Sequence, residues 1–406
     1  MNQADCQFEI VSNEDDLRAL EHEWDDLWSR AHGQYGQSFN VCWLAWQHVA
    51  KPRGRRLCCI VHRENGQLAM VWPLVTYRRL LWTYLCPLSP EAGDYTRVLM
   101  ADSPNSPALI AGAWRTALTR CGADFIKLPY VDEGSDLHAV ASRERHVMIA
   151  ARTVAAFAKL RDETEWDAFC KTLGTMSGKK PGALERRLSK EGQLAVRVTE
   201  PGDARENAAL VDWILARKRA WGDRVGKRGE WLDSSHYRDF LVNLLCPANG
   251  RAMGRLFVVT LDGAPVAATV VGVGTTCVDG LIASFDDRYA RFGPGSIVVE
   301  HVIKWAFEQR LNVDFGVGAE RFKAYWSRNN ITGAWSAQIA NSRWGVFAFR
   351  SKKAVRAAAR RMARLSGLSG GQRRGASAFV PDNPDNPDNH DDPDSARRLD
   401  LPMNPS

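Results

Sequence analysis

One continuous stretch, residues 280–326, constrains the fold of this 406-residue chain more than any other. It reads as an apolar strand, a basic loop with Gly-Pro-Gly at residues 293–295, a helical run and a second short strand. A glycine turn at a helix start exposes backbone N–H groups that no carbonyl within the helix can satisfy. The helix dipole, Arg288 and Arg291 add positive charge there. The sequence therefore predicts an anion seat suited to a pyrophosphate.

The same order of elements is predicted twice along the chain, from hydrophobic residues at helical or alternating spacing. Each half begins with a strand, two helices and a hairpin, predicted at 8–11, 14–28, 39–49, 57–62 and 68–77, and again at 194–199, 204–221, 234–245, 255–261 and 265–273. The first half closes with a helix at 110–120 and a strand at 124–128. The second half has a further strand at 278–285 and closes with a helix at 296–310 and a strand from 313. We expect two related α/β domains in tandem.

The predicted domain limits follow from this repeat and from changes in composition. Residues 1–155 and 156–345 form the two domains, 346–374 a basic segment and 375–406 a tail. The tail repeats Pro-Asp-Asn from residue 381 and is rich in proline and acid, so we expect it to be disordered.

Composition is ordinary for a globular protein, with 45% hydrophobic and 25% charged residues. The nine cysteines show no Cys-x-x-Cys spacing, which favours neither a disulfide framework nor a zinc site. The first residues lack a basic, apolar leader, and the longest apolar region, 265–285, is broken by glycines and Asp279. We expect a cytoplasmic protein without a metal.

The sequence has two basic segments, and each is consistent with either a solvated helix or a binding surface. Residues 350–374 contain nine Lys and Arg and no acid, which is typical of a solvated helix or of peripheral contact with an anionic membrane at its inner face. Residues 171–190 form either a solvated basic helix or a wall for an anionic acceptor or for a cofactor phosphate. A nucleic acid is not expected as partner.

The stretch at 285–326 resembles the C-terminal half of the CelD-like GNAT acyltransferases (cellulose-biosynthesis-type acetyltransferases), distant relatives of the FemAB peptidyltransferases. The motifs that carry the resemblance are Phe292-Gly293-Pro294-Gly295, Trp305-Ala306, Asp314 to Gly318, Lys323 and Trp326. Ala290 stands where the usual pyrophosphate signature has Arg or Gln, and Arg291 follows it. The resemblance implies an α/β (α+β) fold of two tandem GNAT-like domains, each a mixed, mostly antiparallel sheet flanked by helices.

The resemblance also implies acetyl-CoA or another acyl-CoA as co-substrate. Its pantetheine arm would lie where the strands 278–285 and 313–317 diverge. The residues expected to bind it are Ser284, Phe285, Arg288, Arg291, Phe292, Gly293, Gly295 and Ser296. The first half has two prolines and two carboxylates at 87–94, a poor phosphate seat, so we expect it to shape the acceptor side.

Transfer of an acyl group to an amine needs a base for the amine proton and an acid for the departing thiolate. Tyr325 is the candidate acid, or else an aromatic packing residue. Glu320 and Asp314 are candidate bases, and Asp314 alternatively braces the strand end. Lys323 binds an acceptor carboxylate or the cofactor, or pairs with Glu320.

The function expected from residues and resemblance together is an acyl-CoA-dependent N-acyltransferase. Its acceptor would be an amino sugar, amino acid or related small amine of envelope polysaccharide or secondary-metabolite biosynthesis. Two alternatives remain: a FemAB-type transferase that uses aminoacyl-tRNA, and a non-catalytic scaffold of a polysaccharide synthesis complex.

Overall fold

The computed structural model describes residues 7–90, 95–175, 178–226, 229–351 and 354. The predicted disordered tail and most of the predicted basic segment lie outside these residues. No helix in the described part is long and apolar enough to cross a membrane.

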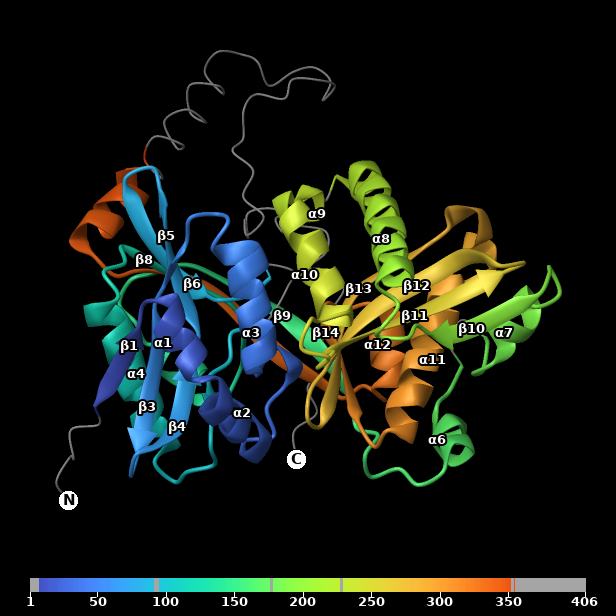
Figure 1. Ribbon diagram of the computed structural model, residues 1–406, viewed down its shortest axis with the longest axis horizontal. Helices are drawn as coiled ribbons and strands as arrows, with labels where there is room; N and C mark the ends of the chain where they lie inside the picture. The colour runs from blue at the N-terminus through green and yellow to red at the C-terminus, as the bar shows by residue number, and fades with distance from the viewer. Residues whose placement is uncertain (1–6, 91–94, 176–177, 227–228, 352–353, 355–406) are drawn as a thin grey trace, which may run out of the picture.

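The first half of the chain is mostly strands, with helices on both faces (Figure 1). Its elements are β1 (Phe8–Val11), α1 (Glu14–Ala19), α2 (Glu21–Arg30), η1 (Tyr35–Gln37), α3 (Phe39–Ala45), η2 (Trp46–Ala50), β2 (Arg56–Leu57), β3 (Cys59–Glu64), β4 (Gln67–Trp72), β5 (Leu74–Arg79), β6 (Trp82–Pro87), β7 (Leu99–Met100), α4 (Ser106–Arg120), β8 (Phe125–Asp132), α5 (Asp136–Ala141) and β9 (Val147–Ala158).

The second half follows the same order after two short helices. Its elements are α6 (Trp166–Thr172), α7 (Ala183–Leu188), β10 (Leu194–Val198), α8 (Ala204–Val225), α9 (Glu230–Asp233), α10 (Ser235–Leu245), β11 (Gly254–Leu261), β12 (Ala264–Val273), β13 (Cys277–Phe285), η3 (Asp287–Phe292), α11 (Pro294–Glu308), β14 (Asn312–Val317), α12 (Arg321–Trp326) and β15 (Ile331–Ala340). A further helix covers residues 343–351.

Local chemistry explains where several elements begin and end. The side chains of Asn13 and Ser234 accept backbone N–H groups at the starts of α1 and α10. Asn65 and Gly66 both have positive φ in the turn between β3 and β4, the conformation that an Asn-Gly hairpin favours. The predicted strand 68–77 is divided at Pro73, which has no N–H to donate to a neighbouring strand.

The strands form one sheet of eleven and one of four, with orders β10-β11-β12-β13-β14-β9-β15-β8-β6-β5-β2 and β1-β3-β4-β7. β9, the last strand of the first half, pairs with β14 of the second half. β15, the last strand of the second half, pairs with β8 of the first half as well as with β9. Each half thus adds its last strand to the sheet of the other.

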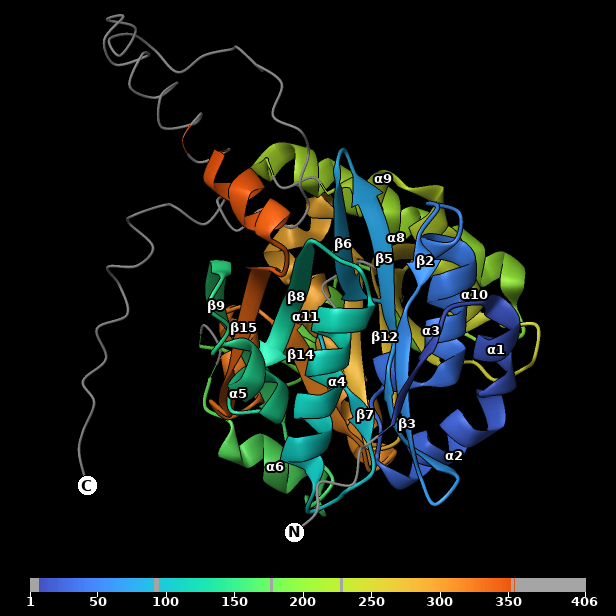
Figure 2. The same cartoon turned by 90° about the vertical axis from the view of Figure 1, so that its left-hand side faces the viewer.

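The two halves also share a hydrophobic core. Trp24 and Phe39 of the first half belong to the same buried cluster as Ile214 and Phe240 of α8 and α10. A second cluster lies between the sheet and α11. The predicted fold class is confirmed: the sheets are mixed and flanked by helices (Figures 1 and 2). The predicted boundary at residue 155 falls inside β9, so the division into domains stays a prediction.

Candidate functional site

β13 and β14 are parallel neighbours that separate soon after they begin. They pair only from Cys277 with Asn312 to Asp279 with Asp314. Beyond this point β13 continues along β12, whereas β14 pairs onward with β9. Leu281 is an extra residue in β13 at the point of separation, a bulge that bends the strand and re-aims its side chains. The strands diverge as the resemblance implies.

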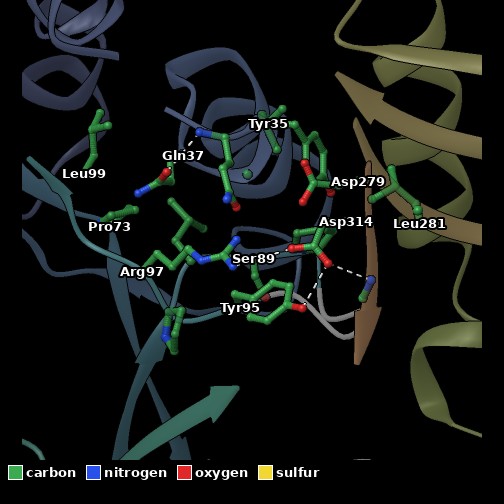
Figure 3. Close-up of a pocket in the computed structure, with 18 residues that line it drawn as sticks. Tyr35, Gln37, Pro73, Ser89, Tyr95, Arg97, Leu99, Asp279, Leu281 and Asp314 are labelled. Atoms are coloured by element: carbon green, nitrogen blue, oxygen red, sulfur yellow. Dashed lines mark hydrogen bonds and ion pairs between the residues drawn. The ribbon is translucent and has the colours of Figure 1, made fainter. Parts of the chain in front are cut away.

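A cavity of about 70 Å³ lies where the two strands diverge (Figure 3). The second half contributes Asp279, Gly280, Leu281, Asp314 and Gly316 to its wall. The first half contributes η1 and its neighbours (34–37), the segment 87–90, Tyr95 and Arg97. The cavity therefore exists only because the two halves are packed together.

Asp314 is the most constrained carboxylate in this wall, with only 4% of its surface exposed. Its Oδ1 accepts hydrogen bonds from the Tyr95 hydroxyl at 3.1 Å and from the Gly316 N–H at 2.8 Å. Its Oδ2 lies 3.6 Å from Arg97 Nη2 (Figure 3). Two residues of the first half thus hold a carboxylate of the second half in place. Asp314 also braces the end of its own strand by accepting the Gly316 N–H.

Arg97 joins this group to a second carboxylate. Its guanidinium donates to both oxygens of Asp132, at 2.7 and 3.1 Å, and lies 3.9 Å from the centre of the Tyr95 ring. Burial disfavours the charge, but the hydrogen bonds and charge of Asp132 outweigh this and raise the pKa of Arg97. Burial and the neighbouring charge of Asp314 raise the pKa of Tyr95. Both groups therefore keep their protons and act as donors.

The predicted anion seat lies at the start of α11. Gly293 has a φ of 67°, in the left-handed region that favours glycine, and turns the chain from η3 into the helix. Pro294 occupies the first turn, where a missing N–H costs nothing. A side chain at Gly295 would meet the Phe285 ring at 3.3 Å, so glycine lets the ring lie against the helix start.

The two predicted phosphate-binding arginines both carry ion pairs. Arg288 Nη2 lies 2.8 Å from Asp286 Oδ2 and its side chain is 78% exposed. Arg291 Nη2 lies 3.7 Å from Glu191 and is 70% exposed. Both side chains are at the surface beside the helix start, where a stronger anion such as a phosphate competes with a carboxylate for the guanidinium.

Part of the basic segment 171–190 lies beside this turn. Phe292 is buried, and the guanidinium groups of Arg187 and Arg291 lie 5.3 and 4.6 Å from its ring centre. Glu300 of α11 accepts the Gly182 N–H at 2.6 Å and fixes the start of α7 there. Arg187 is exposed and also lies beside the anion seat, so both interpretations of the segment stay open.

The remaining predicted cofactor residues differ in their placement. Phe285 is 40% exposed and Ser296 is half-buried, both at the helix start. Ser284 is buried and its hydroxyl donates to the Ile214 carbonyl of α8 at 3.1 Å. Because β13 alternates its faces, Ser284 points to α8 and Phe285 to α11, so Ser284 fixes the strand to the helix.

The predicted catalytic residues do not gather in one place. Lys323 is buried, its Nζ donates to the Gly316 and Val317 carbonyls, and it pairs with Glu320 at 3.0 Å. It therefore makes the predicted pair with Glu320 and also braces the end of β14. Tyr325 donates to the Gly174 carbonyl at 3.3 Å, and burial together with the charge of Glu300 raises its pKa. Only Asp314 reaches the cavity.

Sequence reasoning missed Tyr95, Arg97, Asp132 and Asp279. Asp279 is 9% exposed and is the register partner of Asp314, so both carboxylates face the cavity from neighbouring strands. A charged residue in an apolar strand was the available signal for Asp279. Tyr95 and Arg97 follow a loop and Asp132 ends β8, and none of the three carried a signal of its own.

In the described part of the chain, no group of three or more His, Cys, Asp or Glu side chains is placed to hold a metal ion.

Comparison with known proteins supports one part of this account. Residues 182–324 match the family described as "Acetyltransferase (GNAT) domain", a range that contains β13, η3, α11 and β14. A search of curated protein sequences finds no match.

Several solved structures are similar in fold at low sequence identity. The crystal structure of FemX has a TM-score of 0.54 and 13% identity, covering 82% of this chain and 98% of that chain. A tandem GNAT protein from the clavulanic acid biosynthesis pathway has a TM-score of 0.47 and 13% identity, covering 83% and 99%. The C-terminal domain of a lysylphosphatidylglycerol synthetase from Agrobacterium fabrum has a TM-score of 0.49 and 11% identity. The match covers 83% of this chain and 96% of that chain. The diverging strands and the helix start after them thus lie within the range, residues 182–324, that matches the GNAT domain family.

Proposed function

We propose that this protein transfers an acyl group from acyl-CoA, with acetyl-CoA as the first donor to test, to a small acceptor that carries an amine. The single observation that carries the proposal is the divergence of β13 and β14 at a cavity lined by two carboxylates. The donor's diphosphate would occupy the start of α11, where first-turn amides and exposed arginines provide positive charge. The match of residues 182–324 to the GNAT domain supports this choice of donor.

The acceptor side follows from the charges around the cavity. Among the described residues, its wall contains Asp279 and Asp314 and one arginine, Arg97, whose charge is shared with Asp132. A wall with excess negative charge favours a protonated amine over an anion. The first half would therefore hold the acceptor, and the second half the donor.

The reaction then needs one new bond, one broken bond and two proton movements. The amine nitrogen attacks the thioester carbonyl carbon, the C–N bond forms and the C–S bond breaks. Asp314 or Asp279 takes the amine proton, since these two carboxylates line the cavity. The departing thiolate also needs a proton. Tyr325, the donor expected from the resemblance, does not line the cavity, so the proposed source is the second proton that the nitrogen gives up as the amide forms. Tyr95 and Arg97 keep the Asp314 carboxylate oriented.

The experiment that tests the donor site is isothermal titration with acetyl-CoA. A Gly295→Asp variant places negative charge at the helix start and should lower the affinity at least about 100-fold. Gly202→Asp is the matched control, because a side chain at Gly202 meets open space. Absence of binding to the native protein, or equal binding by both variants, would remove the proposal's main support.

An aminoacyl-tRNA-dependent transfer of the FemAB type is the second candidate, because the FemX fold covers most of this chain. Activity that is lost after ribonuclease treatment would favour it over acyl-CoA. The CelD-like assignment, an acceptor from envelope polysaccharide or secondary-metabolite biosynthesis, and a scaffold role rest on the sequence resemblance alone. A scaffold would keep its function after Asp314→Asn.

A further inference from the structure

One end of the molecule presents apolar side chains to solvent, away from the cavity. The tip of the β5–β6 hairpin exposes 81% of Leu80 and 61% of Leu81, and the helix of residues 343–351 exposes 46% of Trp344 and 60% of Phe347. Figures 1 and 2 show the hairpin tip and this helix at the same end of the molecule. We call these four side chains the apolar end surface.

The apolar end surface is held by specific contacts. The Trp344 ring stacks on Trp82 of β6 with centroids 6.2 Å apart, and on Phe347 at 5.6 Å. Asp124 accepts the Thr83 N–H at 3.0 Å and the Ser342 hydroxyl at 2.6 Å, so one carboxylate ties the hairpin to the helix start. The fold keeps both elements together although their tips bury little apolar surface.

Basic side chains surround these apolar ones. Arg78 and Arg79 precede the hairpin tip on β5, and Arg343 and Arg350 lie on exposed positions of the helix. Lys352 and Lys353 follow residue 351 in the sequence. Exposed Leu, Trp and Phe side chains among arginines are typical of a surface that enters the headgroup region of an anionic bilayer.

We propose that the apolar end surface docks on an anionic membrane, with Leu80, Leu81, Trp344 and Phe347 in the interface and the arginines on the lipid headgroups. A second copy of the chain fits less well, because a twofold contact would bring two copies of the same basic surface together, Arg78, Arg79 and Arg343 included. The chain's own acidic segment, residues 381–395, has no aliphatic or large aromatic side chain to cover the leucines. The proposal stands apart from the acyl transfer.

Co-sedimentation of the full chain with vesicles tests it, using phosphatidylcholine vesicles with and without phosphatidylglycerol. The test variant is Leu80→Asn with Leu81→Ser, because Leu80 has a φ of 55° that asparagine tolerates. The control is Ile331→Ser, an apolar residue elsewhere on the surface that is 45% exposed. Circular dichroism melting checks that both variants fold.

We expect the native chain and Ile331→Ser to bind only the anionic vesicles, and the double variant to bind at least about tenfold more weakly. Adding Phe347→Ser should weaken binding further. Native protein that ignores anionic vesicles, or a double variant that binds as well as native, would overturn the proposal. Self-association in analytical ultracentrifugation that the double variant loses, without vesicle binding, would assign the surface to a second copy instead.

Discussion

Two parallel strand pairs occupy equivalent places in the large sheet, on either side of the central β9–β15 pair. β13 and β14 form one, and β6 and β8, paired through Tyr84 with Phe125 and Leu85 with Ile126, form the other. After β13 the chain makes η3, turns at Gly293 and enters α11 at once. After β6 it runs through residues 88–90 along the cavity wall, and the next helix begins only at Ser106.

The difference shows how one topology provides two kinds of wall. The second half presents the first-turn amides of a long helix and exposed arginines, which suit an anion. Pro87 and Pro90 of the first half have no N–H to donate, so the described segment 87–90 offers an anion fewer backbone donors. It instead closes the cavity opposite Asp279 and Asp314. We infer that donor and acceptor bind to different halves.

The largest expected effect comes from Asp314, where the halves meet. If it takes the amine proton, Asp314→Asn should lower kcat/KM about 10²- to 10⁴-fold and leave acetyl-CoA affinity near native. Asp15→Asn, an exposed substitution on α1, is the matched control. Steady-state kinetics with titration calorimetry would measure both quantities. Native activity in Asp314→Asn would exclude Asp314 as the base and leave Asp279 as the candidate in this cavity.

Arg97 tests how strongly the first half supports the second. Arg97→Leu leaves Asp132 and Asp314 without their shared cation and should lower the free energy of unfolding by about 3–5 kcal/mol. Arg97→Lys keeps the charge but loses the paired hydrogen bonds, so its loss should be smaller. Urea unfolding would rank the three proteins. A Leu variant as stable as native would mean that the contact between halves contributes little.

A third prediction concerns Asp286, whose carboxylate pairs with Arg288 beside the anion seat. The hydrogen bond from Arg288 lowers the pKa of Asp286 and outweighs burial, which would raise it. Arg217 is a second cationic partner, 2.8 Å away. A lowered carboxyl pKa stabilises the fold above the unfolded pKa of about 3.9, and this stability is lost as pH falls through the folded value. Asp286→Asn should therefore cost about 1–3 kcal/mol at pH 7, with the difference shrinking below pH 4.

Unfolding experiments from pH 3 to pH 7 would show this convergence. The control is Asp287→Asn, whose side chain is 58% exposed and pairs with Arg224. A cost that stays constant down to pH 3 would mean that the ionised carboxylate of Asp286 is not what stabilises the turn.

Arg291 should give the smallest effect. Its pair with Glu191 is exposed, so Arg291→Ala should change the free energy of unfolding by less than about 1 kcal/mol. Its affinity for acetyl-CoA should fall about three- to tenfold, and the salt dependence of binding should become weaker. Arg288→Ala, measured beside it, would show which arginine meets the phosphates. Unchanged affinity in both variants would leave the helix amides alone to hold the donor.

Part of this arrangement was predictable because it is local in sequence. The strand, glycine turn and helix at 280–308 lie within a single segment, and their order alone predicts the anion seat at Gly293. The order of elements, repeated in the two halves, also follows from the periodic spacing of hydrophobic residues. Caps such as Asn13 and Ser234 depend on residues two or three positions away, so they too were within reach.

The exchange of β9 and β15, and with it the cavity, was not predictable from these patterns. Tyr95 and Asp314 are more than two hundred residues apart in sequence, and only the pairing of β9 with β14 and of β15 with β8 brings their halves together. Lys323 is a different case. Its motif was recognisable in the sequence, but its role depends on backbone carbonyls that are positioned only when the end of β14 has folded.

A structure with a non-reactive acetyl-CoA analogue bound would test the central claim most directly. The account predicts the diphosphate at Gly295 and Ser296, and the acyl group between β13 and β14 beside Asp279 and Asp314. An analogue bound elsewhere, or β13 and β14 paired along their full length in the complex, would contradict it.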